Sequence, residues 1–189
     1  MTPNASGSSP EDSTLAARQQ FDELFTLVYD ELRRLASVVR RGDGSATPTL
    51  TPTVLVNEAW LKLAPSPSLA QTSRVHFKRL AARAMRQVLV EAARRRKARK
   101  RPGGADLMIV PYDEQSDPRQ TGHIDVLALD DALKDLARLN RRQATVVEGK
   151  FFGGLEVEEL AELLGVSPST VRNDWRMARA WLKSQLDET

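Results

Sequence analysis

Apolar side chains recur at steps of three and four residues in the first half of the chain, in three stretches separated by polar breaks. The stretches span residues 21–39, 52–65 and 77–89. This spacing places the apolar side chains of each stretch along one face of a helix. We expect the first helix to end near Gly42 and the second near Pro65, and we expect the three helices to enclose one small core.

Threonines occupy alternate positions just before the second helix, at Thr47, Thr49, Thr51 and Thr53. Thr51 is placed to cap the helix, because a threonine hydroxyl can accept a hydrogen bond from a backbone N–H of the first turn. Pro52 suits the first helical position, where a missing N–H costs nothing. Capping therefore accounts for Thr51 and leaves the other threonines unexplained.

A second helical part follows residue 125. Leucines recur between residues 127 and 139, the stretch "RRQATVVEGKFFGG" continues the pattern, and a short helix at 157–164 stops at Gly165. Ser167 and Pro168 then supply the N-cap and first residue of a longer helix. A helix, a glycine turn and a capped helix form the pattern of a helix-turn-helix, with an ordinary helical hairpin as the alternative. We expect its two helices to pack through Leu160, Ala161 and Leu164 on the first and Val171, Trp175 and Ala178 on the second.

The solvent-facing side of the last helix carries side chains that suit DNA. Arg and Asn can make bidentate hydrogen bonds to the guanine and adenine edges in the major groove. The predicted DNA-binding face consists of Ser169, Thr170, Arg172, Asn173 and Arg176.

The charge distribution adds a second basic surface. The chain has 189 residues, 41% of them hydrophobic, a net charge of +3 and a pI near 9.4. Between residues 74 and 101 twelve basic residues stand against one acid, Glu91. Arg79, Arg83 and Arg86 lie on the polar side of the third helix, so a rigid element displays the charge. This favours a nucleic-acid backbone as the partner over a merely solvated basic face.

Several classes of function are excluded. The chain has no cysteine and only two histidines, which excludes disulfides and a conventional zinc site. No apolar run approaches the roughly 18 residues of a membrane span, and the N-terminus has no signal-peptide pattern, so we expect a cytoplasmic protein without membrane insertion. No acid pair, phosphate loop or nucleophile with its base indicates an enzyme, and no cofactor is expected.

Taken in their order along the chain, the motifs of residues 18–186 resemble those of the extracytoplasmic-function (ECF) subfamily of sigma factors, within the sigma-70 family. "LVNEAWLKL" at 55–63 is similar to the family pattern L-V-Q-E-x-F-L-x-L. "RAMRQ" at 83–87, followed by Glu91, Arg94, Arg95 and Arg96, is similar to R-I-A-R-N-x-x-x-D-x-x-R-R-R. Residues 154–172 follow the pattern of the family's second domain, although Asn173 and Asp174 stand where many relatives have basic residues.

The resemblance implies an all-α fold of two small helical domains joined by a flexible linker. It implies a region 2 helical bundle at residues 15–101 and a region 4 helix-turn-helix at 126–186. Composition by itself indicates a disordered tail at residues 1–14 and a linker at 102–125, and the resemblance implies that this linker runs through the polymerase cleft. The five acids of the linker, against the single base Arg119, suit that passage.

The implied partners are core RNA polymerase and promoter DNA. Region 2 would bind the coiled coil of the polymerase β′ subunit and the −10 promoter element, while region 4 would bind the β flap and read the −35 element. The implied polymerase contacts are Leu55, Val56, Asn57, Glu58 and Trp60, and the implied −10 contacts are Arg83, Arg86, Gln87, Arg94, Arg95 and Arg96.

The same alignment places Thr51-Pro52-Thr53-Val54 where relatives usually carry an acidic D-A-E-D sequence. We therefore expect a Ser/Thr protein kinase to phosphorylate Thr51, or failing that Thr53, and so to restore the missing negative charge. The alternative is that Thr51 only caps its helix, and regulation by an anti-sigma factor also stays open. For the chain as a whole, the alternatives are a helix-turn-helix regulator acting without the polymerase core and a serine recombinase. The all-helical first half speaks against the recombinase.

Overall fold

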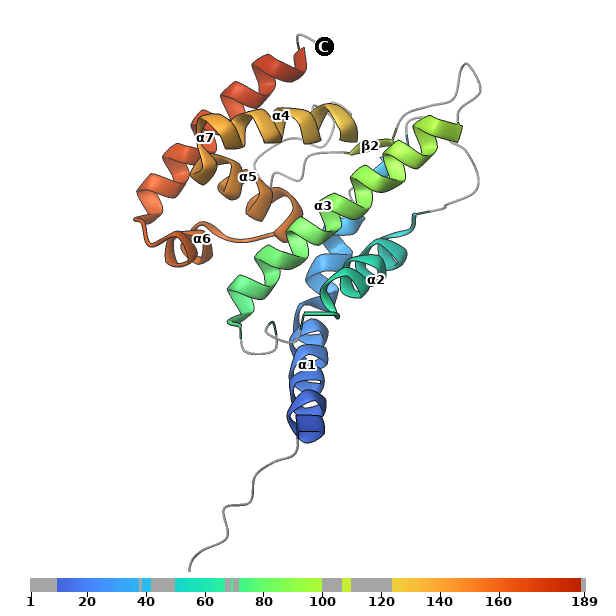
Figure 1. Cartoon of the computed structure of the whole chain (residues 1–189). Coiled ribbons are helices and arrows are strands. Elements are labelled where there is room, and N and C mark those ends of the chain that lie inside the picture. The colour runs from blue at the N-terminus through green and yellow to red at the C-terminus, as the bar shows by residue number, and fades with distance from the viewer. Residues whose placement is uncertain are drawn as a thin grey trace, which may run out of the picture.

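The structure is a computed structural model that describes residues 10–37, 39–41, 50–66, 69, 72–99, 107–109 and 124–187. Within these residues the fold is built almost entirely from helices (Figure 1), which confirms the predicted all-α class. The helices are α1 (Pro10–Ala36), α2 (Pro52–Leu63), α3 (Arg74–Arg99), α4 (Val126–Leu139), α5 (Arg141–Gly153), α6 (Val157–Leu164) and α7 (Pro168–Asp187), and the short strands are β1 (Val39–Arg41), β2 (Leu107–Ile109) and β3 (Ile124–Asp125).

The three strands form a small antiparallel sheet in the order β1-β2-β3, which the sequence pattern does not predict. Val39 pairs with Ile109 in one ladder, and Met108 pairs with Asp125 in the other. The sheet therefore joins the segment after α1, the segment after α3 and the start of α4.

The predicted end of the first helix near Gly42 is wrong. Helix α1 ends at Ala36, and the N–H of Ser37 donates to the carbonyl oxygens of Arg33 and Arg34 in its last turn. The chain then becomes extended and pairs with β2. Val39 therefore lies in a strand, although its spacing in the sequence fits a helix.

The expected tail and linker are described only in part. Helix α1 already begins at Pro10, inside the tail expected at residues 1–14, and residues 1–9 lie outside the described residues. Proline is well suited to a first helical position. Strands β2 and β3 fall within the expected linker at 102–125, whose other residues also lie outside the described part.

Aromatic rings from α1, α2 and α3 meet in the core of the first half. The Phe21 ring packs edge-on against Phe77, with 5.5 Å between ring centroids, and lies 6.1 Å from Trp60. Phe25 lies between Trp60 and Tyr29. Such tilted contacts are favourable for aromatic pairs. The three helices therefore meet in one core as predicted, but they do not enclose it alone, because the same cluster continues into the second half of the chain.

The second half of the chain, α4 to α7, packs directly on the first half, α1 to α3. Helix α3 lies between α1 and α2 on one side and α4 and α5 on the other (Figure 1). One hydrophobic cluster runs through both halves, from Phe21 on α1 to Leu182 on α7. In this conformation the two helical parts share a core.

None of the helices in the described part of the chain has the length and apolar character that a membrane crossing requires.

Candidate nucleic-acid interface

Helices α6 and α7 form the predicted helix-turn-helix. Helix α6 ends at Gly165, whose φ of 63° lies in the left-handed region that glycine adopts without strain. The N–H of Thr170 donates to the hydroxyl of Ser167 at 3.2 Å, which makes Ser167 the N-cap of α7 and Pro168 its first residue. The turn and the cap are therefore confirmed.

The packing of the two helices also follows the prediction, with one correction. Leu160, Ala161 and Val171 belong to a second buried cluster, together with Val146 of α5 and Leu155, and Leu164 and Trp175 pack against it. Ala178, expected in this contact, lies instead in the larger core. The reason is that it sits two turns further along α7, where the helix has passed α6 and meets α4 and α5.

The outer side of α7 presents the predicted DNA-binding face. Ser169, Arg172, Asn173 and Arg176 are exposed, and Thr170 is half-buried. The Arg176 guanidinium donates to Oδ1 of Asn173 at 2.7 Å. Arg172 lies 3.8 Å from a carboxylate oxygen of Glu158 on α6. This contact is exposed and long, so it leaves the arginine available to a ligand.

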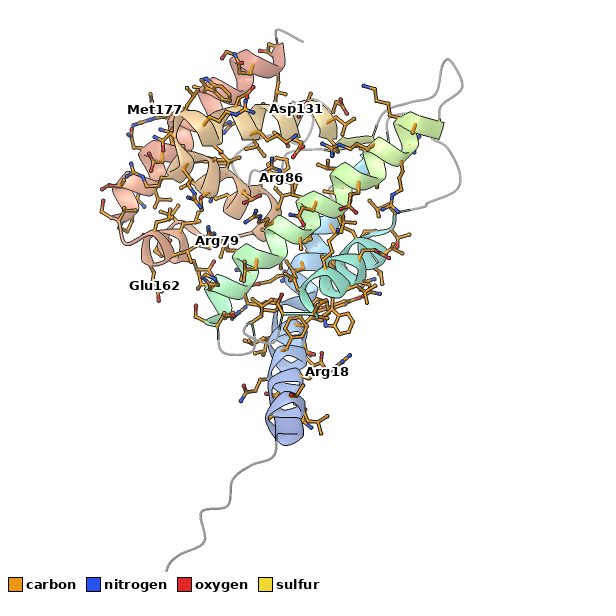
Figure 2. All side chains as sticks on the ribbon, viewed as in Figure 1. Arg18, Arg79, Arg86, Asp131, Glu162 and Met177 are labelled. Atoms are coloured by element: carbon orange, nitrogen blue, oxygen red, sulfur yellow. The ribbon has the colours of Figure 1, made fainter. Side chains whose placement is uncertain are left out.

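Sequence reasoning missed Met177, which extends the same face. Its side chain is 55% exposed and projects from the outer side of α7 (Figure 2). A large apolar side chain with that much exposure, next to Arg176 and Asn173, can contact a thymine methyl group. The signal in the sequence is that Met177 lies four residues after Asn173, one helical turn along the face.

Sequence reasoning also missed the role of Asp174. Its carboxylate is buried on the inner side of α7 and accepts two hydrogen bonds from Arg142 of α5, Nε to Oδ2 at 2.5 Å and Nη2 to Oδ1 at 3.2 Å. These hydrogen bonds and the negative charge of Asp174 raise the pKa of Arg142. The pair fixes the rotation of α7 relative to α5, and with it the direction in which Arg172 and Arg176 point.

Helix α3 supplies the second basic surface, but its side chains do not all face solvent. Arg83, Gln87, Arg94 and Arg95 are exposed, and Arg96 is half-buried. Arg86 differs from these residues because its side chain is only 17% exposed and points from α3 toward α4 (Figure 2).

The Arg86 guanidinium is bound by the second half of the chain. Nε and Nη2 donate to Oδ1 of Asp130 on α4, at 3.0 and 2.8 Å. Nη2 also donates to the Asp130 carbonyl oxygen, and Nη1 donates to Glu148 on α5 at 3.1 Å. All three nitrogens of the predicted DNA contact are therefore used within the chain.

Asp130 is the centre of this cluster. Its other oxygen accepts from Lys134 at 2.7 Å and lies 3.7 Å from Arg94. Burial by itself raises the pKa of Asp130, but the hydrogen bonds and charges of Lys134 and Arg86 outweigh it and hold the pKa below its usual value. The carboxylate is thus ionised at neutral pH and paired with several cations.

The exposed side of α2 can carry a protein contact. Asn57 and Glu58, predicted to bind polymerase, are exposed, and Trp60 is half-buried in the aromatic core. Leu55 and Val56 are fully buried, so their side chains hold α2 in the bundle and do not reach its surface. Val54 and Leu61 are exposed instead and extend the surface around Asn57 and Glu58.

The two candidate threonines lie at the start of α2. Thr51 is the N-cap, as predicted, and its hydroxyl accepts from the N–H of Val54 at 3.2 Å. Thr53 lies in the first turn, and both side chains are half-buried. The first turn of α2 contains no acidic residue.

Comparison with known proteins gives one family. The model of that family, described as ECF sigma factor, matches residues 16–188, which include both basic surfaces and α2. No curated protein matches the chain.

Proposed function

Because the chain belongs to the ECF sigma factor family, whose members are transcription initiation factors, we propose that its two halves divide promoter recognition between them. Residues 15–101 bind core polymerase through α2 and the −10 element through α3. Residues 126–186 read the −35 element through α7 and bind the polymerase β flap. The chain itself supplies no catalytic group and acts in the cytoplasm, where polymerase and DNA are found.

The observation that carries this proposal is the outer face of α7. Arg172, Asn173 and Arg176 project from one side of a capped helix whose rotation is fixed by Asp174 on the opposite side. Rigid display of Arg and Asn is what direct readout in the major groove requires.

The test is transcription with purified components. Core polymerase together with the full chain should initiate at a defined set of promoters, and neither component alone should do so. The chain should also co-purify with core polymerase. A helix-turn-helix regulator acting without the core would bind DNA alone and would not co-purify, and that result would overturn the proposal.

We further propose that docking of α2 on polymerase is controlled by phosphorylation of Thr51 or Thr53. Support comes from the position of both residues at the N-terminus of a helix whose first turn lacks acids, beside the exposed Asn57 and Glu58. A phosphate adds about −1.5 to −2 charges and is favoured at a helix N-terminus.

The experiment compares core-polymerase binding by the unmodified chain, the kinase-treated chain, and Thr51→Ala and Thr53→Ala variants treated in the same way. Thr49→Ala serves as the control, since it removes a threonine that belongs to the same sequence tract but is not a candidate for phosphorylation. Kinase treatment should strengthen binding, and one of the two variants should abolish the gain. Equally tight binding before and after treatment would leave Thr51 as a capping residue only.

A further inference from the structure

A hydrogen bond joins two side chains on the outer face of α7. Nη2 of Arg176 donates to Oδ1 of Asn173 at 2.7 Å, and both side chains are exposed. Residues three apart are neighbours on a helix surface, so the two side chains meet without any change in the backbone. In the part of the chain that the structure describes, no other hydrogen bond or ion pair engages Arg176. Asn173 therefore holds the guanidinium in place.

The chemistry of the two groups determines how the Asn173 amide is turned. A guanidinium has N–H donors and no acceptor, so the amide oxygen must face Arg176 and the amide NH2 points away. A bidentate contact with adenine needs this oxygen to accept from the adenine amino group while the NH2 donates to N7. Because a charged donor already lies at the oxygen, a second donor is disfavoured there. Asn173 is thus poorly placed to read adenine by itself.

The other polar groups of the outer face leave it rich in donors. The hydroxyls of Ser169 and Thr170 lie 2.8 Å from Oγ of Ser167, so they are turned toward the helix cap. The Asp174 carboxylate is buried on the opposite side of α7, where Arg142 binds it. The face therefore presents the N–H groups of its two arginines and its asparagine.

Donors on the protein select acceptors on the DNA. In the major groove guanine presents two neighbouring acceptors, N7 and O6, whereas adenine and cytosine each present an amino donor. Arg176 keeps both N–H groups of Nη1 and the second N–H of Nη2, and these two nitrogens match the two guanine acceptors. The arginine can therefore bind guanine without releasing Asn173.

The group that holds Arg176 is neutral, which distinguishes this arginine from Arg172. Arg172 lies 3.8 Å from the Glu158 carboxylate, whose charge offsets part of its own. The Asn173 amide offsets no charge. It restricts a long side chain that would otherwise lose more rotamer freedom when DNA binds, which is the benefit of preorganisation. Arg176 thus keeps its full attraction for an electronegative base edge.

We propose that Arg176 reads a guanine of the −35 element, and that Asn173 is its positioning residue and reads no base of its own. The inference rests on the proposed role of α7 in promoter recognition. It requires the two residues to act on the same base pair, whereas an asparagine that read its own base would act on a different one.

The test selects sequences from a promoter pool randomised at the −35 element, with the full chain bound to core polymerase. Arg176→Ala should reduce the preference for guanine at one position by about tenfold, as the loss of a bidentate contact does. Asn173→Ala should reduce the same preference at the same position by about twofold, the effect of an exposed helix pair. The double variant should match Arg176→Ala alone, because Asn173 acts through the arginine.

Asn173→Asp separates the two groups of the amide. It keeps an oxygen at the position of Oδ1 but lacks the NH2, so it can hold Arg176 and cannot donate to a base. The added negative charge should weaken binding to all sequences, while the preference for guanine stays that of the parent chain. Gln20→Ala removes an exposed amide on α1 and is the control, which should change neither quantity. Circular dichroism of each variant verifies that the helices persist.

Three results would overturn the proposal. Arg176→Ala could weaken binding to every sequence equally, which would make Arg176 a phosphate contact. Asn173→Ala could change the preference at a different base pair, which would give Asn173 a base of its own. Finally, Asn173→Asp could lose as much of the guanine preference as Asn173→Ala does, which would mean that the amide oxygen does not hold the arginine.

The selection is repeated with the full chain alone, so that the result does not depend on polymerase binding. If a sequence is enriched only by the chain alone, the proposed function is wrong, and the same variants still decide the roles of Arg176 and Asn173. If no sequence is enriched with or without polymerase, α7 does not read DNA and both proposals are wrong.

Discussion

Arg172 lies on the outer face of α7, with one long contact to Glu158. We predict that Arg172→Ala relaxes the preference for one or two positions of the −35 element, with a loss of about 1–3 kcal/mol for the preferred base. Competition binding among single-base variants of a promoter measures the effect, and Lys183→Ala, further along α7, is the control. An equal loss on every sequence would identify Arg172 as a phosphate contact.

The Arg142–Asp174 pair is asymmetric, because the arginine side chain is 46% exposed and the carboxylate only 3%. Arg142→Ala leaves a buried charge without its partner, whereas Asp174→Asn leaves the arginine in contact with water. We therefore predict that Arg142→Ala lowers the free energy of unfolding by more than Asp174→Asn does. Thermal and denaturant unfolding of the two variants provides the comparison. The reverse order would mean that the pair is not what holds α7.

At the scale of single helices, the start of α2 depends on Thr51. We predict that Thr51→Ala lowers the free energy of unfolding of the unmodified chain by about 1 kcal/mol, because the N–H of Val54 loses its acceptor. Thr51→Ser keeps a hydroxyl at the cap and should stay close to the parent. Equal stability of all three proteins would contradict the capping role.

We propose that the C-terminal part of α3 contributes to the strength of DNA binding and not to the choice of sequence. We predict that replacing Arg94, Arg95 and Arg96 with Gln reduces the salt dependence of DNA binding in the polymerase complex by about two to three units of slope, because each phosphate contact releases a counterion. Replacing Arg33, Arg34 and Arg138 is the control with equal charge change elsewhere. An unchanged slope would mean that this part of α3 does not touch DNA.

Helix starts and the helix-turn-helix were predictable because their signals are local. Thr51 and Ser167 cap helices through groups three residues away, and Gly165 determines its own turn. The end of α1 was not predictable in this way. The position of Val39 fits a helical period and a strand equally well. It lies in a strand because it pairs with Ile109, which is far away in the sequence.

At the scale of the whole molecule, the packing of the halves could not be read from the sequence. A basic side of α3 predicts an anionic partner, but it does not distinguish DNA phosphate from carboxylates of the same chain. For Arg86 the partners are Asp130 and Glu148, whose helices carry no periodic signal that points to α3. Arg83, one turn earlier, is exposed. The residue type alone therefore does not determine whether an arginine of α3 faces solvent or another helix.

The same cluster makes the contact between the halves sensitive to acid. The folded pKa of Asp130 is below its unfolded value, so its contribution to stability is complete above the unfolded pKa, about 3.9, and is lost as pH falls through the lower folded pKa. We predict that the free energy of unfolding falls over this acidic window, which denaturant unfolding at a series of pH values measures. Asp130→Asn should remove the Asp130 part of the dependence. An identical pH profile in Asp130→Asn would mean that Asp130 does not contribute to it.

The shared core also has a consequence for folding during synthesis on the ribosome. Helix α3 is synthesised well before α4 and α5, against which it packs, and before Leu182 of the common core. At the usual 5–20 residues per second, roughly 4 to 18 seconds pass between the completion of α3 and that of α7. During this interval the apolar side of α3 that later meets α4 and α5 has no partner from its own chain. We therefore expect the nascent first half to need protection from aggregation until α4, α5 and α7 have been made and cover that side.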